Sequence, residues 1–551
     1  MTQTTESWGS RVGLILAMAG NAVGLGNFLR FPVQAVQNGG GAFIIPYLVC
    51  FLLMGIPLLW IEWSMGRFGG KFGHHSTPFI LDTMDKRKFW KYIGVFGIFT
   101  NVAVASYYCY LESWTLSYAY HSVVRTFSGM SQDEVAAFFG NYVSLKTYTE
   151  PMFFFVLCLF LNTWILSRGL SGGVEKVSKI GMPLLILFGM FLAYMAITLT
   201  AGEQGAINDG TLGLSYLWTP QFDSLTNPKV WLAAAGQIFF TLSVGMGTIQ
   251  CYASYVKPKE DIALNAMSAG WMNEFVEVVL GSAIIIPISI GYLGIDKVVE
   301  MTTSGGLGLG FKTLPYLFEQ WGPMLAVCAG FMWFILLFFA GITSSLAMGT
   351  PFMGFFQDEF NWKREHSAWA FGAVVFVLGL PTVLFFNEGV FDEYDYWAGT
   401  VSLVVFALAE TILFAWVFGI DKGWNEIMSG SDINIPTIFK FIIKYITPLL
   451  LFFVFIGALF LPLNNDWVSA MGSLKHGHFW TLDNGSIVKQ IMNSGIKEQI
   501  AASTDEVKIA ELKNKMFYIN AARILLLAVF AGIGYLVFVA YKKRVREGRI
   551  T

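Results

Sequence analysis

The sequence predicts an all-α polytopic membrane protein with about twelve transmembrane helices. Charged residues make up 13% of the 551-residue chain and hydrophobic residues 55%, whereas a soluble domain carries about a quarter charged residues. The apolar residues also fall in long blocks, and the segment 42–65 holds a single charge, Glu62. Because about twenty apolar residues suffice to cross a bilayer as a helix, each block predicts a membrane span.

Twelve such blocks follow one another along the chain, separated by polar loops. In chain order they cover residues 12–36, 41–66, 89–123, 152–168, 177–199, 229–255, 262–293, 322–355, 366–386, 394–419, 436–462 and 516–541. We expect a membrane core at 1–460, containing the first eleven spans. The remainder, 461–551, would hold a long outer loop, the last span and a basic tail.

Basic residues set the expected orientation, because loops rich in lysine and arginine stay in the cytoplasm. Loop 67–91 carries six basic residues and the tail 542–549 carries five, whereas loop 387–393 has three acidic residues and no basic one. With an even number of spans, both termini are expected to be cytoplasmic. The polar start, Met1 to Ser10, lacks a basic signal-peptide region, so the first span is expected to be retained.

Several function classes find no support in the composition. The net charge of −2 gives no field that would attract nucleic acid. The five cysteines lie in apolar blocks and have no spacing typical of a disulfide framework or a zinc site. We find no nucleophile–base pair, paired catalytic carboxylates or metal-ligand motif, and therefore expect no enzymatic activity.

Two glycine motifs interrupt apolar blocks at matching places. Val23-Gly24-Leu25-Gly26 lies in the first span and Val244-Gly245-Met246-Gly247 in the sixth. An offset of five spans inverts the second unit, and paired interruptions of this kind indicate a binding site at the bilayer midplane. Glycines also allow close helix packing, which is the alternative explanation. We predict a 5+5 inverted repeat, spans 1–5 and 6–10, with broken helices 1 and 6.

Neutral oxygen donors lie beside the two interruptions and on two further spans. They are Asn21, Asn27, Thr241, Ser243, Asn273, Thr343, Ser344 and Ser345. A backbone broken inside a bilayer is tolerated only where it lines a cavity or binds a ligand. Free carbonyls suit a cation and free amides an anion, and neutral oxygens without cysteine or histidine favour a hard cation such as sodium. A lone hydroxyl usually bonds its own backbone, but donors converging from four spans favour a binding site.

Five motifs together resemble the neurotransmitter:sodium symporter family, over residues 8 to 460. They are Gly20 to Pro32, Asn38 to Phe43, Gly236 to Ser243, Ala340 to Ser345 and Asp395 to Thr400. The resemblance implies a sodium-coupled symporter of neutral, hydrophobic L-amino acids that works by alternating access. The alternative is a sodium-dependent amino-acid sensor on the same fold that does not transport.

The resemblance also implies two sodium sites and a substrate site. The first sodium site would use Ala22, Asn27, Thr241 and Asn273 together with the substrate carboxylate. The second would use Gly20, Val23, Ala340, Thr343 and Ser344. The substrate site would consist of Ala22, Leu25, Gly26, Val104, Tyr108, Phe240, Thr241, Ser243, Met246, Ser344 and Met348, in which the amides of Leu25 and Gly26 and the Tyr108 hydroxyl hold the carboxylate.

Two features narrow the expected substrate class. Monoamine carriers of the family have an aspartate where this chain has Gly24, and a glycine leaves room for a substrate carboxylate. A leucine-transporting member carries a phenylalanine and an isoleucine where this chain has Met246 and Met348. Methionine is unbranched and adaptable, so we expect larger side chains such as Met, Phe or Trp to be accepted. The alternative is that both methionines only fill the core.

Charged residues inside the spans are assigned by the same resemblance. Arg30 and Asp395 would form the outer gate, and Trp8 and Asp358 the inner gate. Thr5 stands where the family has the inner-gate arginine, so either the inner latch is weaker or Arg11 or another cation substitutes. Chloride-dependent members carry a serine at the position of Glu277; a carboxylate there predicts chloride-independent transport.

The remaining expectations concern the setting of the protein. We expect a multi-pass protein of the inner (plasma) membrane, in contact with lipid and an amino-acid substrate, and the sequence leaves a homodimer open. The loop 124–151 contains no cysteine and is shorter than in animal members, which favours a prokaryotic source. The sequence does not fix the preferred amino acid, the sodium stoichiometry or proton counter-transport.

Overall fold

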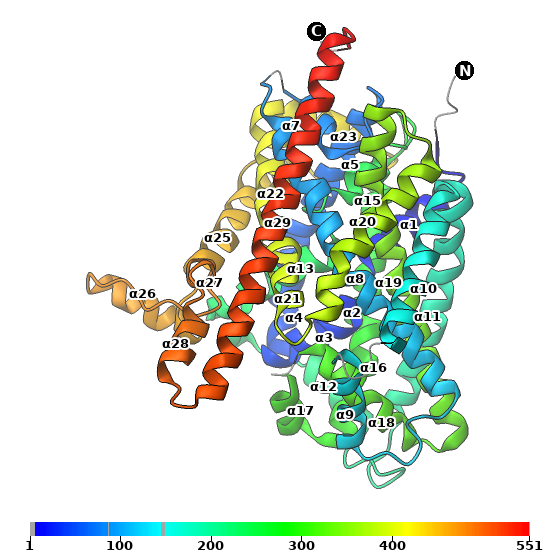
Figure 1. The fold of residues 1–551 in the computed structure, drawn as a ribbon, viewed down its shortest axis with the longest axis vertical. Coiled ribbons are helices and arrows are strands. Elements are labelled where there is room, and N and C mark those ends of the chain that lie inside the picture. Colours follow the sequence, from blue (N-terminus) through cyan, green and yellow to red (C-terminus); the bar gives the residue numbers. More distant parts are fainter. Residues whose placement is uncertain (1–5, 86, 145–148, 303–304, 550–551) are drawn as a thin grey trace.

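The computed structural model describes residues 6–85, 87–144, 149–302 and 305–549, and in these residues the chain is a helical bundle without strands (Figure 1). Ten helical segments of the described chain are long and apolar enough to cross a membrane. In chain order they are α4 to α5 (Gly41–Gly70), α7 with α8 (Trp90–Val123), α10 (Thr149–Ser167), η3 with α11 (Leu170–Ile197), α15 to α16 (Ile262–Leu293), α19 (Pro323–Phe360), α20 (Arg364–Leu384), α21 to α23 (Val390–Met428), α24 with α25 (Ile438–Leu459) and α29 (Glu506–Arg546).

Two further elements are broken helices in the interior of the bundle. The first consists of α1 (Arg11–Ala22) and the segment 25–37, formed by α2 (Leu25–Leu29) and α3 (Phe31–Gln37), and is bent by 52°. The second consists of α13 (Pro228–Leu242) and α14 (Thr248–Ala253). The bent pair raises the number of candidate spans in the described chain to eleven. Helices α13 and α14 cover the predicted sixth span with a break at the predicted place, which is consistent with about twelve spans.

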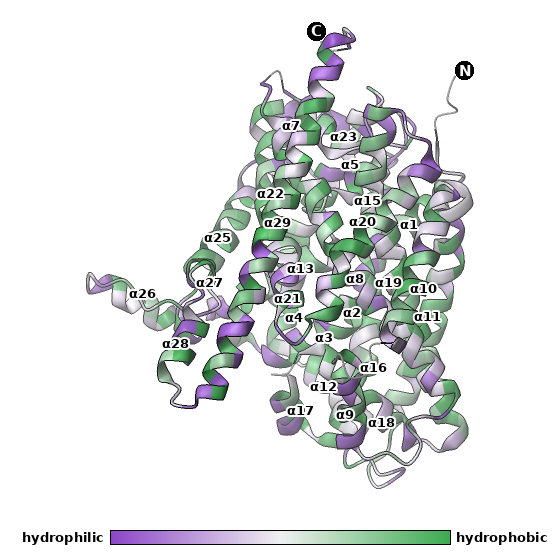
Figure 2. Ribbon diagram, viewed as in Figure 1, coloured by the Kyte–Doolittle hydropathy of each residue, from purple (hydrophilic) through white to green (hydrophobic). Residues whose placement is uncertain are grey.

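The distribution of polarity over the bundle fits a membrane protein. Hydrophobic residues cover the sides of the helices, and hydrophilic residues gather at both ends (Figure 2). The start of α1 and the end of α29 lie at the same end of the bundle, and the short helices α9 (Gln132–Val143), α12 (Gly210–Trp218), α17 (Ile295–Thr302) and α18 (Leu314–Glu319) lie at the other (Figure 1). A chain with an even number of spans has to return its ends to one side in this way.

The spans differ in how deeply they are buried. In the most apolar window, 89% of the residues of α15 to α16 are buried inside the protein, but only 22% of those of α29 are. Helix α8 (Val95–Val123) is buried over almost its whole length, Glu112 included, and packs along α19. The interior of the bundle is therefore formed by the spans that carry the predicted polar residues, and α29 lies at its periphery.

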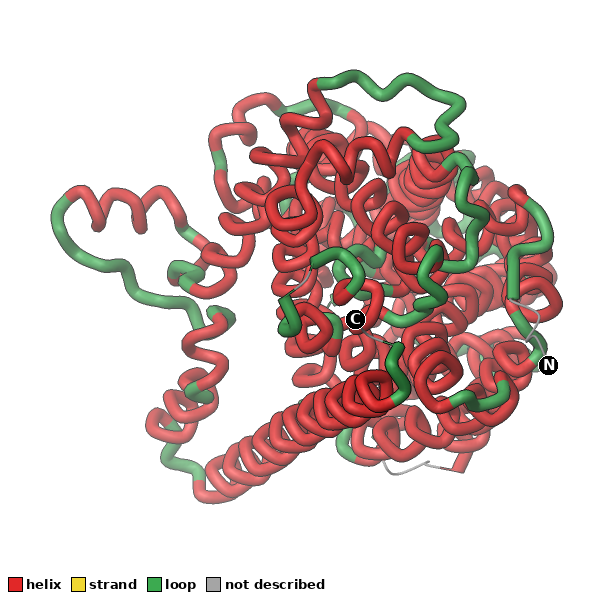
Figure 3. Tube along the Cα trace, turned by 90° about the horizontal axis from the view of Figure 1, so that it is seen from above, coloured by secondary structure: helices red, strands yellow, loops and turns green. Residues whose placement is uncertain are grey.

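The segment 463–515, predicted as a long outer loop, is largely helical. It contains α26 (Trp467–Lys475), α27 (Ile487–Ile491) and α28 (Ser494–Ala502), and α26 projects sideways from the bundle (Figures 1 and 3). Helix α29 begins ten residues before the predicted start at 516, because the Asp505 side chain caps it by accepting hydrogen bonds from the amides of Val507 and Lys508. A side-chain cap of this kind can start a helix well before the apolar pattern does.

Candidate functional site

The break between α1 and α2 places free backbone groups in the interior. Val23 and Gly24 have extended conformations, and the Leu25 amide at the start of α2 donates to the Tyr108 hydroxyl at 3.0 Å. The Gly24 amide donates to Oδ1 of Asn27 at 2.8 Å. A β-carbon added at Gly24 would lie 2.7 Å from the Tyr108 oxygen and 3.1 Å from Oγ of Ser344, so the close approach of Tyr108 requires a glycine.

The break between α13 and α14 is held by contacts with three other elements. Ser243, Gly245 and Gly247 all have positive φ, a region that costs a non-glycine residue roughly 1 kcal/mol. The Ser243 hydroxyl donates to the Asn21 carbonyl at 3.0 Å, which joins the two broken helices. The Gly245 amide donates to the buried Glu62 carboxylate at 2.6 Å, and Asn101 donates to the Met246 carbonyl at 2.6 Å.

Four polar side chains meet beside the first break; we call Asn27, Thr241, Asn273 and Glu277 cluster 1. Asn27 Nδ2 lies 2.8 Å from Oδ1 of Asn273 and 3.0 Å from Oε2 of Glu277. Asn273 Nδ2 lies 2.9 Å from Oγ1 of Thr241, whose hydroxyl donates to Glu277. Three spans, represented by α2, α13 and α15 with η5 (Phe275–Gly281), therefore bring their polar groups to one point.

Glu277 gives cluster 1 a buried carboxyl group that forms no ion pair with any described residue. Its side chain is fully buried and also accepts a hydrogen bond from Gln237 at 2.7 Å. Among the described residues, no lysine, arginine or histidine forms an ion pair with it. An ionised carboxylate in the interior is costly without an opposite charge beside it, so the site fits a bound cation that would balance an ionised Glu277. Asn27 and Asn273 can present amide oxygens to such a cation.

Five oxygen atoms meet on the other side of the first break; we call them cluster 2. Oγ of Ser344 on α19 lies 3.2 Å from the carbonyl oxygens of Gly20, Asn21 and Ala340 and 3.4 Å from that of Val23. A hydroxyl has one hydrogen and can satisfy only one of these acceptors well. Four carbonyls around one hydroxyl are the ligands that a hard cation takes, so this set fits sodium.

Cluster 2 differs from the predicted second sodium site at two residues. The hydroxyl of Thr343 donates back into its own helix, to the Phe339 carbonyl at 2.8 Å, as hydroxyls in membrane helices commonly do. The carbonyl of Asn21 joins the cluster without having been predicted. Every residue has a backbone carbonyl, so residue types do not indicate that the Asn21 carbonyl oxygen takes part.

A cavity of about 30 Å³ lies between the two breaks. Its walls contain nine of the eleven predicted substrate residues, namely Ala22, Gly26, Val104, Tyr108, Phe240, Ser243, Met246, Ser344 and Met348. The other two predicted substrate residues do not line the cavity. The Leu25 amide donates to the hydroxyl of Tyr108, which does line it, and Thr241 belongs to cluster 1. Tyr107, Gly399 and Leu403 also line the cavity and were missed; of these only Gly399 lies in one of the family motifs.

The predicted outer-gate residues, Arg30 and Asp395, line a second and larger cavity of about 360 Å³. The Arg30 guanidinium lies 4.2 Å from the ring centre of Phe240, and Asp395 accepts a hydrogen bond from the Tyr107 hydroxyl at 2.7 Å. Arg30 and Asp395 form no ion pair with each other, although both line the cavity. Tyr107, Tyr108 and Phe240 line both cavities and therefore contribute to the wall between them.

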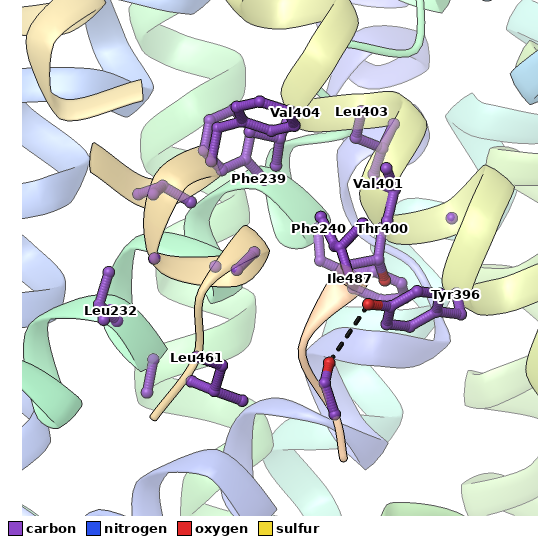
Figure 4. A pocket seen from close by; sticks show the side chains of 18 of the residues that line it. Leu232, Phe239, Phe240, Tyr396, Thr400, Val401, Leu403, Val404, Leu461 and Ile487 are labelled. Atoms are coloured by element: carbon purple, nitrogen blue, oxygen red, sulfur yellow. Dashed lines mark hydrogen bonds between the residues drawn. The ribbon is translucent and has the colours of Figure 1, made fainter. Parts of the chain in front are cut away.

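A third cavity, of about 320 Å³, lies on the far side of Phe240 (Figure 4). Figure 4 shows Phe239 beside Val404 and Phe240 beside Thr400 and Val401, with Ile487 of the outer segment next to them. Leu232 and Leu461 line the opposite side of the cavity. The Tyr396 hydroxyl donates to the Gly485 carbonyl at 3.2 Å. The outer segment therefore covers this side of the gate.

The predicted inner gate is only partly assembled. Trp8 donates to the Tyr252 carbonyl at 3.1 Å, and Asp358 accepts from the His75 amide at 2.7 Å. Arg11 does not replace the missing arginine, because its guanidinium lies 3.4 Å from Asp261 and 3.3 Å from Asp432 instead. Thr5 lies outside the described residues. Among the described residues Asp358 has no ion-pair partner.

Another basic residue does contact the start of the chain at this end. Arg364, at the start of α20, pairs with Glu6 and donates to the Leu166 carbonyl at 2.8 Å. Glu175 in turn accepts hydrogen bonds from the Gly9 amide at 2.7 Å and the Ser10 hydroxyl at 2.9 Å. Residues 6–10 are thus held by Arg364, which pairs with Glu6, and by Glu175, which binds Gly9 and Ser10.

Comparisons with known proteins agree on one family. A model of the sodium:neurotransmitter symporter family matches residues 5–134 and 135–467. An uncharacterized sodium-dependent transporter of Methanocaldococcus jannaschii is 31% identical over 482 residues, 85% of this chain and 93% of the relative. The sodium-dependent nutrient amino acid transporter 1 of Drosophila pseudoobscura pseudoobscura is 24% identical over 515 residues, 82% of this chain and 75% of the relative. The crystal structure of MhsT in complex with L-phenylalanine has a TM-score of 0.71 and 29% identity, covering 82% of this chain and 99% of MhsT.

Proposed function

This chain belongs to the sodium:neurotransmitter symporter family and is a sodium-dependent multi-pass membrane transporter; on this basis we propose that it carries a neutral, hydrophobic L-amino acid together with sodium, independently of chloride. The family consists of secondary transporters and not of enzymes. The observation that carries the proposal is the meeting of clusters 1 and 2 at the two helix breaks, beside one small cavity.

Cluster 2 is the proposed second sodium site. Its ligands would be the carbonyls of Gly20, Val23 and Ala340 and the Ser344 hydroxyl, as the resemblance implies, with the Asn21 carbonyl in addition. A turn of the Thr343 side chain would add its hydroxyl, which lies 3.3 Å from the Ala340 carbonyl. Because the ligands come from α1 and α19, sodium bound there would hold these two helices together.

Cluster 1 is the proposed first sodium site, and it would couple sodium to the substrate. Asn27, Thr241 and Asn273 would supply side-chain oxygens and Ala22 a carbonyl. A substrate carboxylate held by the Leu25 amide and the Tyr108 hydroxyl could reach the same cation. Each of the two bound species then completes the site of the other, so each raises the affinity for the other by the same factor.

The side chains around the small cavity support an apolar substrate. Val104, Phe240, Met246 and Met348 are uncharged and buried or half-buried, and no charged side chain lines the cavity among the described residues. The two methionines can move aside for substrates of different shape. The names of two relatives support the substrate class, since one is a nutrient amino acid transporter and the other binds L-phenylalanine.

Chloride independence follows from the charge of Glu277. An anion bound in cluster 1 would place a second negative charge beside this buried carboxylate, which its hydrogen bonds to Gln237, Asn27 and Thr241 already fix in place. The carboxylate supplies the charge that balances the sodium ion. We therefore propose that chloride has no site to fill.

The orientation rests on the basic residues at one end of the bundle. The start of α1, the loop after α5 and the end of α29 lie together there (Figures 1 and 2), and this loop and tail carry the excess of lysine and arginine. By the positive-inside rule this end is cytoplasmic. We propose the plasma membrane of a prokaryote as the location, and a homodimer stays compatible with it.

Uptake into proteoliposomes tests the function. Purified protein would be given labelled leucine with an inward sodium gradient, or with potassium in place of sodium, and with chloride or gluconate as the anion. We expect uptake that needs sodium, does not change in gluconate, and is inhibited by excess methionine, phenylalanine or tryptophan. Sodium-independent uptake would overturn the mechanism, and sodium-dependent binding without uptake would identify a sensor instead. If none of the three competitors inhibited leucine uptake, the proposal that Met246 and Met348 allow larger substrates would be wrong.

A further inference from the structure

Helix α29 is the one long span outside the segment that the family model matches, which ends at residue 467. It lies along one side of the bundle and packs against α8 and α21 (Val390–Tyr396) (Figure 1). Large apolar side chains on its outer face, such as Ile524, Leu527 and Tyr535, are exposed. Its inner face carries two arginine side chains, the half-buried Arg523 and the buried Arg544.

The outer arginine is tied to the helix that carries the outer-gate residue. Arg523 binds Glu393 of α21 with two hydrogen bonds, of 2.6 Å from Nε and 3.0 Å from Nη2. The two side chains are 15% and 8% exposed. Trp397 donates to the same carboxylate at 2.7 Å, and its ring centre lies 5.6 Å from the Arg523 guanidinium. Glu393 lies two residues before Asp395, on the same short helix.

The inner arginine is tied in the same way to the surroundings of the inner-gate residue. Arg544 binds Glu359, which is adjacent to Asp358, through a 2.6 Å bond from Nε and a second bond from Nη2. These side chains are 5% and 1% exposed. Arg544 also lies 3.0 Å and 3.2 Å from the ring nitrogens of His74, and the next residue, His75, donates its amide to Asp358.

His74 contacts Arg544 as a neutral imidazole. Burial, and then the charge of Arg544, lower the pKa of His74 to about 3. The imidazole is therefore neutral and can accept a hydrogen bond. The guanidinium also lies 4.0 Å from the ring centre of Phe79, and Lys543 donates to the Glu359 carbonyl at 2.7 Å.

The spacing of the two arginines matches the thickness of the membrane. Arg523 and Arg544 are twenty-one residues apart in an uninterrupted helix, which is about 31 Å at 1.5 Å per residue, close to the roughly 30 Å of the hydrocarbon core. The helix contains no proline or π-helical turn, unlike α21 to α23. A continuous helix of this kind transmits displacement along its axis.

We infer that α29 is a strut that positions both gates: Arg523 positions Asp395 through Glu393, and Arg544 positions Asp358 through Glu359 and His74. Planar, bidentate arginine–carboxylate pairs fix orientation as well as distance. Loss of the outer pair frees α21 and favours an open outer gate, and loss of the inner pair favours an open inner side. The inference rests on the proposed function, because it takes Asp395 and Asp358 as gate residues.

Gate opening can be followed at two cysteine reporters in a background in which Cys328, the one native cysteine that is not fully buried, is replaced by serine. Val33→Cys reports on the larger cavity that Arg30 and Asp395 line. Thr248→Cys reports on the inner half of the bundle, where the Thr248 side chain is fully buried and its hydroxyl has no hydrogen-bond partner. The rate of labelling by a polar maleimide is measured on purified protein in sodium alone, so that no substrate has to be known.

Arg523→Gln is expected to raise the labelling rate at the outer reporter by at least about fivefold, the lower end of typical coupling between sites, without raising the inner rate. Arg544→Gln is expected to do the reverse. Exchange of the charges in Arg523→Glu with Glu393→Arg should restore the outer rate. Lys513→Gln and Arg546→Gln, at exposed positions of α29, serve as controls and should stay within about twofold of the parent.

Two results would overturn the inference: unchanged rates at both reporters, or both rates rising together in each variant, which a general loss of packing would produce. Glu393→Gln and Glu359→Gln repeat the test from the other partner if an arginine variant does not fold. Sodium-dependent uptake by the parent protein is measured separately. If the parent protein shows no uptake but the two arginine variants affect different reporters as expected, the proposed function is rejected and the role of α29 is supported. If uptake is normal but the reporters do not change, the proposed function is supported and the role of α29 is rejected.

Discussion

Replacement of Glu277 by glutamine removes the carboxyl group that would carry a negative charge beside a sodium ion in cluster 1, while keeping the shape of the side chain. The amide oxygen of glutamine can still accept the hydrogen bond from Gln237, which is 2.7 Å long in the present structure. Because Glu277 is fully buried and, among the described residues, forms no ion pair, the charge that is lost is the one that would balance a bound sodium ion. The variant therefore tests whether the carboxylate belongs to the sodium site.

The size of the effect follows from distance. A sodium ion on the Thr241 hydroxyl, which bonds directly to Glu277, would lie roughly 5 Å from the carboxylate, one metal–oxygen contact and one hydrogen bond away. Two unit charges at this distance attract by about 3 kcal/mol at an effective dielectric constant of 20. This corresponds to a loss of sodium affinity of about a hundredfold.

Sodium titration of labelled leucine binding measures this loss. The control is Glu410→Gln, since Glu410 is equally buried but contacts Gln250 and none of the cluster 1 residues; its sodium affinity should stay within about threefold. Glu277→Ser should bind sodium weakly in gluconate and recover in chloride. A sodium affinity of Glu277→Gln within threefold of the parent, or a parent protein that loses uptake in gluconate, would refute the reasoning.

Three further predictions concern other parts of the structure. Gly24→Asp places a β-carbon 2.7 Å from the Tyr108 oxygen, so leucine binding should fall below detection in a binding assay while the sodium-dependent thermal shift persists; retained leucine affinity would contradict the assigned carboxylate site. Ser344→Ala removes the central hydroxyl of cluster 2 and should weaken sodium about tenfold, the effect of one polar contact, whereas an unchanged sodium titration would exclude this site. Burial lowers the pKa of His74 to about 3 and of His75 to about 4, so below a pH of about 6.5 the unfolded chain binds protons at these residues and the folded chain does not. Each histidine should therefore lower the free energy of unfolding by about 1.4 kcal/mol at pH 5.5, and acidification to this pH should lower the melting temperature less when both are replaced by glutamine.

The spans were predictable because a bilayer imposes a length and a composition on every helix that crosses it. The block 41–66 and the helical segment Gly41–Gly70 nearly coincide, as do 262–293 and Ile262–Leu293. The breaks were predictable for a related reason, since only glycine-rich segments with polar neighbours can leave helical geometry inside a membrane. The prediction of a loop for the outer segment 463–515 is wrong, because short helices outside the membrane do not need a long apolar block, which is the pattern that the prediction used.

The candidate site was predictable to the level of residues but not of atoms. Asn27, Thr241 and Asn273 are polar in an apolar context and were visible as candidates, whereas the Asn21 carbonyl and the turn of the Thr343 hydroxyl toward its own helix were not. Backbone oxygens and side-chain rotations leave no trace in residue type. Tyr107 and Leu403 were missed for a different reason: most apolar and aromatic residues in a span belong to the core, so residue type does not single out those that line a cavity.

The sequence alone determined that this protein crosses the membrane about twelve times and breaks two helices at glycines beside neutral oxygens, because local composition dictates both properties. Only the tertiary structure decided which charges meet. Arg11 binds Asp261 and Asp432 instead of Asp358, and Glu6 pairs with Arg364. Arg523, near the middle of α29, and Arg544, near its end, bind carboxylates 130 and 185 residues away in the sequence. Such pairs depend on how helices pack across the whole chain, and no local pattern encodes a contact between residues that far apart.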